Sequence, residues 1–426
     1  MSNGPRPLTD TVRTGTRHMQ IVVMGAAFPR HPEAGVDRVN VRRVRALSTR
    51  APVVAVVPTP WTPPGLRGPA GRWASYAATP RRAEIDGVQL FYPRYVQVRG
   101  MGPWAGVTMA IGAAGIIRQL RHAGRCDVLL AQDILPDGLA AVLLGRWIGV
   151  PATCLGRGTD IHGLTSAPAM TRGMVRWTLG RMAAIGVVAA ALGETLERVA
   201  GTAACTLLED GIDLEHFAPG CARTARRALG IDEDARLVLY AGRLVDGKGL
   251  DTLLDGFGLL RATVPDAMLA LVGSGRLQTA LECRAVAQGH GDAVRVVGEV
   301  AHRRIVDWMR AAEVVVLPSE AEGFPNVVRE ALACGRPVVA TPVGDVPRVL
   351  TADAGRLVPP RDPAALAHAI ADVLARRWDA ATIRAHVSDM TWERSAEATA
   401  RFLTAALSAA PVADGRRSAA PEAPAA

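Results

Sequence analysis

Four charged residues in the second half of the chain have types and a spacing that suit a ligand with a sugar at one end and a diphosphate at the other. Glu322 and Glu330 flank Gly323-Phe324-Pro325-Asn326, and Arg243 and Lys248 stand five positions apart in a glycine-rich segment. A carboxylate accepts hydrogen bonds from hydroxyl groups, so one glutamate can contact a sugar and the other a ribose. A guanidinium fork and an ammonium point charge, here called the basic pair, can together clamp a diphosphate.

The residues around the two glutamates are predicted to form a strand, a loop and a helix. Residues 314–317 are a continuous apolar run, typical of a strand buried on both faces, and residues 327–334 contain helix formers that end before Gly335. Glu322 therefore falls in a loop at the carboxyl end of a strand, where ligands bind in parallel α/β sheets, and Glu330 lies in the following helix. On spacing alone, an ordinary crossover with one solvated glutamate and one favoured by the helix dipole is the simpler interpretation.

This segment, continued by residues 330–341, resembles the signature of the family 4 glycosyltransferases. The resemblance implies an α/β protein of the GT-B fold, with two doubly wound Rossmann-like domains facing each other across a cleft, and an enzyme that retains the anomeric configuration. It also implies that the basic pair holds the donor diphosphate. Glu322, with the backbone of residues 324–326, would orient the sugar, and Glu330 would hold the ribose.

Three further residues join the donor site that this resemblance implies. Gly273 opens a Gly-x-Gly turn after one apolar strand, and Val297 lies at the end of the next strand. In relatives such strand ends border the nucleotide base. Gly35, at the start of a predicted helix, would let backbone N–H groups approach a phosphate. Relatives commonly have a Gly-Gly pair here, whereas this chain has Ala34 before Gly35.

The segment Gly156-Arg157-Gly158-Thr159-Asp160 supplies two candidates from the first half of the chain. Many relatives have a His-Gly-x-Asp segment here that faces the transferred sugar; Arg157 takes the place of the histidine, and Asp160 is retained. The Arg-Gly-Thr-Asp form resembles the teichuronic acid biosynthesis glycosyltransferases. A guanidinium stays protonated and cannot act as a base, but Arg157 can hold a diphosphate or an acceptor phosphate. Asp160 fits a sugar contact or a helix N-cap equally well. With Glu322 and the basic pair, these two are the candidate catalytic residues.

The domain boundaries follow from an interdomain segment and from the composition of the chain ends. Residues 207–213 resemble the family's interdomain segment, with Asp210 in place of the usual asparagine; the turn tolerates both residues. Arg348 stands where relatives often have glutamate, a change that the sequence does not explain. We expect an acceptor-side domain over 19–206, completed by a returning helix over 390–408, a nucleotide-sugar-binding domain over 207–389, and disordered tails over 1–18 and 409–426.

Composition limits the other function classes. The 426 residues are 49% hydrophobic and carry a formal charge of +9, which allows an anionic partner. The arginines are spread out rather than clustered with aromatic residues, so we expect no nucleic acid as partner. The six cysteines have neither disulfide nor zinc spacing. No apolar signal segment precedes the first predicted strand, so a cytoplasmic protein is expected.

Two segments bear on membrane contact. Residues 101–117 are uncharged, but four glycines and a proline favour a core or interfacial helix over a membrane span. Residues 170–193 combine Arg172, Arg176 and Arg181 with apolar residues. They fit either a helix lying on an anionic membrane or a helix packed on the first sheet with three snorkelling arginines. A peripheral position on the inner face of the plasma membrane is therefore part of the hypothesis.

The sequence predicts no metal ion or other cofactor. The only Asp-x-Asp triplet, at 232–234, is expected in a solvated turn rather than at the strand end that metal-dependent transferases use. The expected partners are a UDP- or GDP-linked sugar donor and a glycan or polyprenyl-diphosphate-linked acceptor in cell-envelope or exopolysaccharide synthesis. Two alternatives stay open. One is a nucleotide-sugar epimerase or hydrolase on a similar scaffold, and the other is a glycan-assembly partner that binds nucleotide sugar without turning it over.

Overall fold

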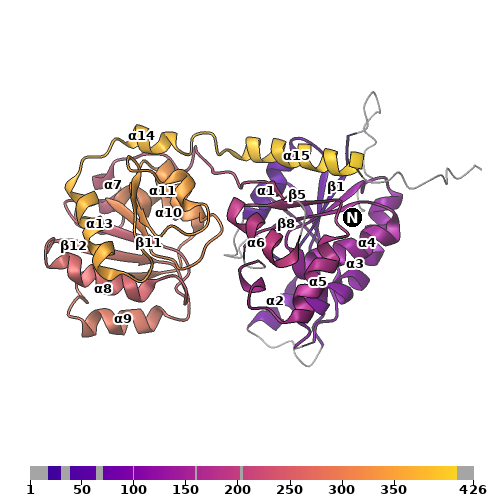
Figure 1. The fold of residues 1–426 in the computed structure, drawn as a ribbon, viewed down its shortest axis with the longest axis horizontal. Coiled ribbons are helices and arrows are strands. Elements are labelled where there is room, and N and C mark those ends of the chain that lie inside the picture. Colours follow the sequence, from indigo (N-terminus) through magenta and orange to yellow (C-terminus); the bar gives the residue numbers. More distant parts are fainter. Residues whose placement is uncertain are drawn as a thin grey trace, which may run out of the picture.

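The computed structural model describes residues 18–29, 39–63, 71–98, 100–158, 161–201 and 205–409. These residues form two lobes, each built on its own sheet, and α15 (Trp392–Ala409) returns from the second lobe to the first (Figure 1). Two predicted site residues, Gly35 and Asp160, lie outside the described residues.

The first lobe contains an eight-stranded sheet in the order β10-β9-β8-β7-β1-β2-β5-β4, parallel except for the hairpin of β4 and β5. Its strands are β1 (Ile21–Met24), β2 (Val53–Val56), β4 (Arg82–Ile85), β5 (Val88–Phe91), β7 (Val128–Ala131), β8 (Ala152–Gly156), β9 (Ala184–Val187) and β10 (Thr206–Leu207). A separate pair joins β3 (Thr59–Pro60) to β6 (Arg94–Tyr95). The helices are α1 (Val39–Ser48), α2 (Arg72–Ala78), α3 (Ala105–His122), α4 (Leu139–Ile148), α5 (Ala169–Leu179) and α6 (Ala190–Ala200).

The second lobe contains a six-stranded, fully parallel sheet in the order β13-β12-β11-β14-β15-β16. Its strands are β11 (Arg236–Ala241), β12 (Ala267–Val272), β13 (Val294–Gly298), β14 (Val314–Leu317), β15 (Val338–Ala340) and β16 (Gly355–Leu357). Its helices are α7 (Ala222–Ala228), α8 (Leu250–Arg261), α9 (Gln278–Ala287), α10 (Ile305–Ala311), α11 (Asn326–Ala333), α12 (Val346–Val349), α13 (Pro363–Ala375) and α14 (Ala380–Ala385).

The central strands are apolar on both faces because helices cover both sides of each sheet (Figure 1). Every residue of β1 and of β14 is buried. In the second sheet, Val238 pairs with Val314, and Val315 pairs with Val338, so neighbouring strands run in the same direction. Their carboxyl ends, and the loops that follow them, therefore lie along one edge of the sheet.

The chain passes between the lobes twice, near residues 211–212 and near residues 390–392, and these two segments lie side by side. Ile212 N donates a hydrogen bond to Met390 O at 2.8 Å, and Gly211 lies against the backbone of Trp392 at the start of α15. Helix α15 then packs on α1 of the first lobe (Figure 1). The returning helix that the sequence predicted is present, whereas the division of the domains at residues 206 and 207 stays a prediction.

Two sequence expectations were wrong in detail. The proline and glycine content of residues 59–80 predicts one long loop, but they include β3 and α2, because residues 72–78 contain neither glycine nor proline. Residues 170–193 do not form one helix, since α5 ends before Gly180 and α6 begins only at Ala190. The apolar run of residues 183–191 also predicts a strand, and residues 184–187 do pair with β8 as strand β9. The antiparallel hairpin of β4 and β5 was not predicted.

Residues 101–117, for which a core or interfacial helix was expected, lie mostly in α3. Met109, Ala113 and Ile117, which are four residues apart, are fully buried, whereas Ile111 is exposed. This period is that of a helix with one face packed on the protein. None of the described helices combines the length and the apolar composition that crossing a membrane requires.

Candidate functional site

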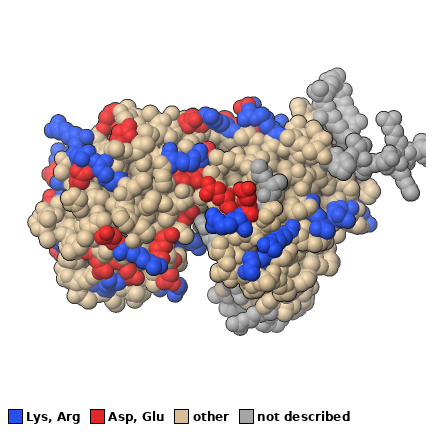
Figure 2. Space-filling view, viewed as in Figure 1, with Lys and Arg blue, Asp and Glu red and all other residues tan. Residues whose placement is uncertain are grey.

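The predicted donor residues lie in loops at the carboxyl edge of the second sheet. Arg243 and Lys248 belong to the loop between β11 and α8, and Glu322 belongs to the loop between β14 and α11. Strands β11 and β14 are neighbours in the sheet, so the two loops are adjacent. Figure 2 shows a hollow between the two lobes that opens at the lower edge of the view.

Glu322 and Lys248 contact each other directly. Lys248 Nζ lies 2.5 Å from Glu322 Oε1, and the two side chains are 17% and 15% exposed. Ser319 Oγ donates a hydrogen bond to the same carboxylate oxygen at 2.8 Å. The backbone also joins the two loops, since Glu320 N donates to Gly247 O at 2.9 Å. A basic and an acidic residue that are far apart in the sequence thus meet at this edge.

Lys248 is the only lysine in the sequence; the other 48 residues among the 49 lysines and arginines are arginines. An ammonium is a compact point charge, which a planar guanidinium does not reproduce. Space beside Lys248 is restricted: a Cβ atom on Gly249, whose φ is 65°, would lie 2.0 Å from Pro318 O. A single lysine in an arginine-rich chain is a sequence signal for this site, and the prediction from motif and spacing did not make use of it.

Arg243 lies on the exposed side of the same loop. Its carbonyl oxygen accepts a hydrogen bond from the Tyr240 hydroxyl at 3.0 Å. Burial, and after it the negative charge of Glu322, raise the pKa of Tyr240, so this hydroxyl stays a donor. Within the described part of the chain, the Arg243 guanidinium makes no hydrogen bond or ion pair. This exposed guanidinium is therefore available to an anion.

Glu330 lies on α11 near a contact between the lobes. Its Oε1 is 3.6 Å from His302 Nε2, and Arg42 of α1 approaches the same nitrogen to 3.2 Å. A guanidinium can only donate, so Nε2 is the acceptor there. Burial and the positive charge of Arg42 lower the pKa of His302 to about 4, so the ring is neutral at neutral pH and forms no ion pair with Glu330. The structure brings Lys248 to Glu322, but Arg243 and Glu330 do not touch.

The two residues predicted to border the nucleotide base lie at the ends of β12 and β13. Gly273 N donates to Gly298 O at 2.8 Å, and Gly273 has a φ of 138°. A Cβ atom on Gly273 would lie 1.9 Å from Gly242 O, so only glycine fits between these turns. Val297 is half-buried in β13. Gly273 thus lies against the start of the loop that carries Arg243, which is compatible with the predicted donor site.

The loop of residues 323–326 contacts the first lobe. A Cβ atom on Gly323 would lie 3.2 Å from Leu192 of α6, and Asp345 N donates to Gly323 O at 2.9 Å. The Asp345 carboxylate accepts hydrogen bonds from Ala190 N at 2.8 Å and Ala191 N at 3.2 Å. A carboxylate of the second lobe therefore caps the first turn of a helix in the first lobe. The sequence did not indicate this cap, because its partners lie about 155 residues apart.

Arg348, whose presence the sequence could not explain, reinforces this contact. Its Nη1 lies 2.8 Å from Asp345 Oδ2 and 2.9 Å from Glu209 Oε1. Glu209 belongs to the segment that connects the lobes. An arginine at this position therefore links the capping aspartate to the connector, which a glutamate could not do beside two carboxylates.

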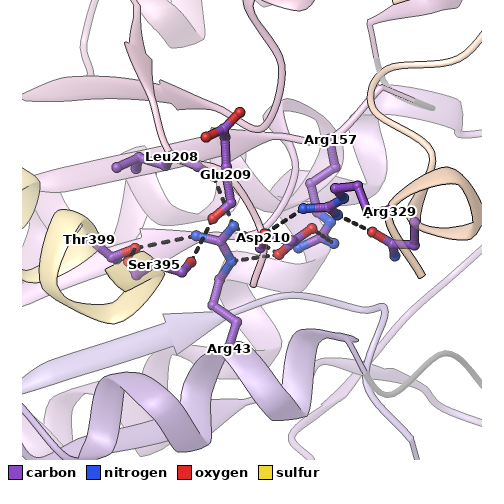
Figure 3. A network of polar contacts seen from close by, with 9 residues as sticks. Arg43, Arg157, Leu208, Glu209, Asp210, Arg329, Ser395 and Thr399 are labelled. Atoms are coloured by element: carbon purple, nitrogen blue, oxygen red, sulfur yellow. Dashed lines mark hydrogen bonds and ion pairs between the residues drawn. The ribbon is translucent and has the colours of Figure 1, made fainter. Parts of the chain in front are cut away.

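Arg157, predicted to lie in the loop that faces the transferred sugar, contacts Asp210 in the connector between the lobes (Figure 3). Its Nη2 lies 2.8 Å from Asp210 Oδ2, and Arg43 donates to Oδ1 at 2.8 Å. Burial raises the pKa of Asp210, but the charges of Arg157, Arg43 and Arg329 outweigh it and lower the pKa to about 2. The two positions that depart from the family's usual histidine and asparagine thus form an ion pair. Describing Asp210 only as a tolerated turn residue was incomplete, and a phosphate contact for Arg157 stays a prediction.

Two other features lie apart from this site. The triplet at 232–234 forms a turn, as expected: Asp234 N donates to Asp232 Oδ1, and Glu233 pairs with Arg227. A cavity of about 490 Å³ lies between α15 and strands β9 and β10 at one end of the first sheet, and none of its lining residues is a predicted site residue. Among the described residues, no three His, Cys, Asp or Glu side chains are grouped to hold a metal ion.

Two α/β lobes with charged loops at the carboxyl edge of the second sheet define the class: this is the GT-B fold. Sucrose-phosphate synthase from Thermosynechococcus elongatus has a TM-score of 0.74 at 22% identity and covers 92% of this chain and 100% of that one. The Anabaena protein Alr3699/HepE, solved in complex with UDP, has a TM-score of 0.64 at 16% identity over 92% and 98% of the two chains. At these identities the likeness shows the fold, which confirms the predicted fold class.

Sequence comparisons agree with the fold. Residues 222–386 match the family described as glycosyl transferases group 1. D-inositol 3-phosphate glycosyltransferase of Streptomyces scabiei is 37% identical over 217 residues, which are 47% of this chain and 48% of that protein. This chain therefore spans about half the length of that relative. The putative teichuronic acid biosynthesis glycosyltransferase TuaC of Bacillus subtilis is 27% identical over 83% of this chain and 88% of that protein.

Proposed function

We propose that the protein is a retaining glycosyltransferase that moves a sugar from a UDP- or GDP-linked donor to a glycan or polyprenyl-diphosphate-linked acceptor without a metal ion. The observation that carries the proposal is the contact between Lys248 and Glu322 at the edge of the second sheet where Arg243 is also exposed. The match of residues 222–386 to the family described as glycosyl transferases group 1, and the relatives named as glycosyltransferases, support it.

In the proposed mechanism, the bond between the sugar and the diphosphate breaks through an oxocarbenium-like state. The departing diphosphate gains negative charge, which Lys248 and Arg243 stabilise from the loop before α8. Glu322, with the backbone of Gly323, Phe324, Pro325 and Asn326, orients the sugar. The N–H groups at the start of α11 favour the same negative charge.

Other residues are assigned by the predicted role of their position. Glu330 holds the ribose, and Gly273 and Val297 border the base. In the first lobe, Gly35 approaches a phosphate. Arg157 and Asp160 belong to the loop that faces the transferred sugar or the acceptor.

The acceptor side is assigned to the first lobe, in cell-envelope or exopolysaccharide synthesis at the cytoplasmic side of the membrane. The formal charge of +9 favours a phosphate-bearing acceptor over a neutral one. The names of two relatives refer to D-inositol 3-phosphate and to teichuronic acid biosynthesis, which supports an anionic acceptor here.

Peripheral contact with an anionic membrane is proposed for α5. Met170 and Trp177 are exposed on this helix, and the Arg181 guanidinium lies 4.2 Å from the centre of the Trp177 ring. Exposed aromatic and basic residues on one helix fit the interface of an anionic bilayer. Sedimentation with anionic vesicles tests this proposal. Wild-type protein should sediment with the vesicles, and the variant Trp177→Ser/Arg181→Ser should not. Wild-type protein that stays in the supernatant would show that the proposed membrane contact is wrong.

Donor turnover tests the main proposal. Purified full-length protein is incubated with UDP- and GDP-sugars, with or without a lipid-linked acceptor, and nucleoside diphosphate release is measured together with the anomeric configuration of the product. Release that requires acceptor, gives retention and survives EDTA is expected. Sugar isomerisation or hydrolysis with donor alone would favour the epimerase or hydrolase alternative. Nucleotide binding with no release under any condition would favour the non-catalytic alternative.

A further inference from the structure

Arg329 is a buried arginine in the middle of the predicted donor segment, between Phe324 and Glu330. Its side chain is 2% exposed. The sequence did not single it out, since an arginine on a helix is usually solvated. Burying a guanidinium is costly unless its donors are satisfied. Both Nη atoms of Arg329 have hydrogen-bond partners, whereas its buried Nε has none.

Two contacts of Arg329 hold residues of the donor loop. The Arg329 guanidinium carbon lies 4.6 Å from the centre of the Phe324 ring. Its Nη2 donates to Asn326 Oδ1. The planar group therefore stacks on one predicted donor residue while it binds the amide of another. Together the two contacts fix the loop between Gly323 and α11.

The third contact is with the connector between the lobes. Arg329 Nη1 donates to the carbonyl oxygen of Asp210 at 2.5 Å. The Asp210 carboxylate is in turn held by Arg43 of α1 and by Arg157 at the end of β8 (Figure 3). Arg43 also donates to Thr399 of α15 at 3.3 Å. The connector residue is thus tied to the first sheet, to α1 and to the returning helix.

We propose that Arg329 is a positioning residue. Through its contacts with Asp210 in the connector and with Phe324 and Asn326, it fixes the position of the donor loop relative to the first lobe. The inference rests on the proposed function for its kinetic consequence only. The structural consequence, a donor loop ordered through Arg329, does not depend on turnover.

The test compares Arg329→Lys and Arg329→Met with Arg226→Lys as a matched control. Arg226 is also a buried arginine of the second lobe, 5% exposed, but its donors go to Ala311 O, Glu233 O and Glu313. Lysine keeps the charge but cannot bridge three partners, and methionine keeps most of the volume without charge. If the methionine variant fails to fold, the lysine variant still decides.

Two readouts are used. Hydrogen exchange of the backbone amides within residues 323–328, where Pro325 has none, should accelerate about tenfold or more in both Arg329 variants, and not in Arg226→Lys, because a lost anchor lowers local stability. In the Arg329 variants, the affinity for UDP or GDP alone, measured by calorimetry, should fall. If wild type turns over the donor, kcat/KM of these variants for the donor should also fall by about a hundredfold, because misplacing an orienting group typically has an effect of this size.

Unchanged exchange at residues 323–328 in Arg329→Lys would overturn the positioning role, and so would equal acceleration in the Arg226 control. Wild-type protein without transfer activity would count against the proposed function, while hydrogen exchange would still decide the role of Arg329. The two failures are therefore distinguishable.

Discussion

At the residue scale, Lys248 combines a unique residue type with a tight environment. Its ammonium is held by Glu322, beside a backbone turn that leaves no room for a Cβ on Gly249. We expect Lys248→Arg to lower kcat/KM for the donor by about 10²- to 10³-fold, although the charge is kept, because a guanidinium would form a two-pronged pair with Glu322 rather than face a diphosphate. Steady-state release of nucleoside diphosphate measures this.

The single lysine also gives a direct probe. Reductive methylation with ¹³C-formaldehyde should produce one lysine resonance besides that of the terminal amine, and this resonance should shift on addition of UDP or GDP. Arg227→Lys, on an exposed side chain of α7, adds a second lysine resonance as a control that should not move. A Lys248 resonance that ignores nucleotide would place the diphosphate elsewhere.

Asp210 predicts a pH dependence of stability. Its pKa is lowered to about 2 in the folded protein, below the ordinary value of about 3.9 for an unfolded chain. The stabilisation is therefore fully present above about pH 4 and is lost as pH falls toward about 2, for a total of about 2 kcal/mol. We compare the free energies of unfolding of wild type and Asp210→Asn, measured by urea unfolding at several pH values. The difference between them should decrease as pH falls from about 4 to about 2. A difference that stays constant below pH 4 would mean that folding does not change the pKa of this carboxylate.

At the element scale, the sequence predicted the second sheet well, and the structure shows why. Residues 314–317 and 294–298 form strands with the predicted bounds. A short apolar run between turn residues is typical of a buried strand in a parallel sheet, and the turn residues mark its two ends. Residues 170–193 were harder, since an apolar stretch of that length fits a helix or a strand until Gly180 and the pairing with β8 divide it. Pairing partners decide such cases, and they are not local in sequence.

The same limit applies to the site. The loop motif that contains Glu322 is local, so spacing and resemblance found it. The ion pair of Arg157 with Asp210 joins the first lobe to the connector, and the cap of α6 by Asp345 joins the two lobes. Each residue alone has an ordinary explanation, as a loop cation, a turn residue or a surface acid. Only the fold brings them together.

The cap of α6 gives a prediction for an element. Asp345→Ala should reduce the free energy of unfolding by about 1 kcal/mol, as loss of an N-cap does. It should also lower kcat/KM, because the variant loses the carboxylate that joins residue 345, whose backbone N–H donates to Gly323 O, to α6 of the first lobe. Denaturant unfolding and donor kinetics measure the two effects.

Asp362→Ala is the matched control for this cap. Asp362 accepts a hydrogen bond from Ala365 N and caps α13 within the second lobe, away from the contact between lobes. It should cost similar stability while leaving kcat/KM within about twofold of wild type. Equal kinetic loss in both variants would show that Asp345 acts through stability alone.

At the scale of the whole molecule, several of the contacts between the lobes are polar. They include the cap of α6 by Asp345, the bridge of Arg348 to Glu209, and the contact of Arg42 with His302. Polar contacts can exchange protein partners for water at small net cost, whereas a packed apolar interface cannot. Such contacts hold the lobes in register and permit them to separate.

Removing two of these contacts should therefore open the molecule without unfolding it. In the variant Arg42→Ala/Arg348→Ala, we expect a larger radius of gyration by solution X-ray scattering, an unchanged circular dichroism spectrum, and a return toward the wild-type radius when UDP or GDP bridges the site. The variant Arg303→Ala/Arg376→Ala, on exposed arginines of the second lobe, controls for loss of charge. If the radius stays at the wild-type value in both variants, the polar contacts do not set the separation of the lobes, and the connector with α15 fixes it alone.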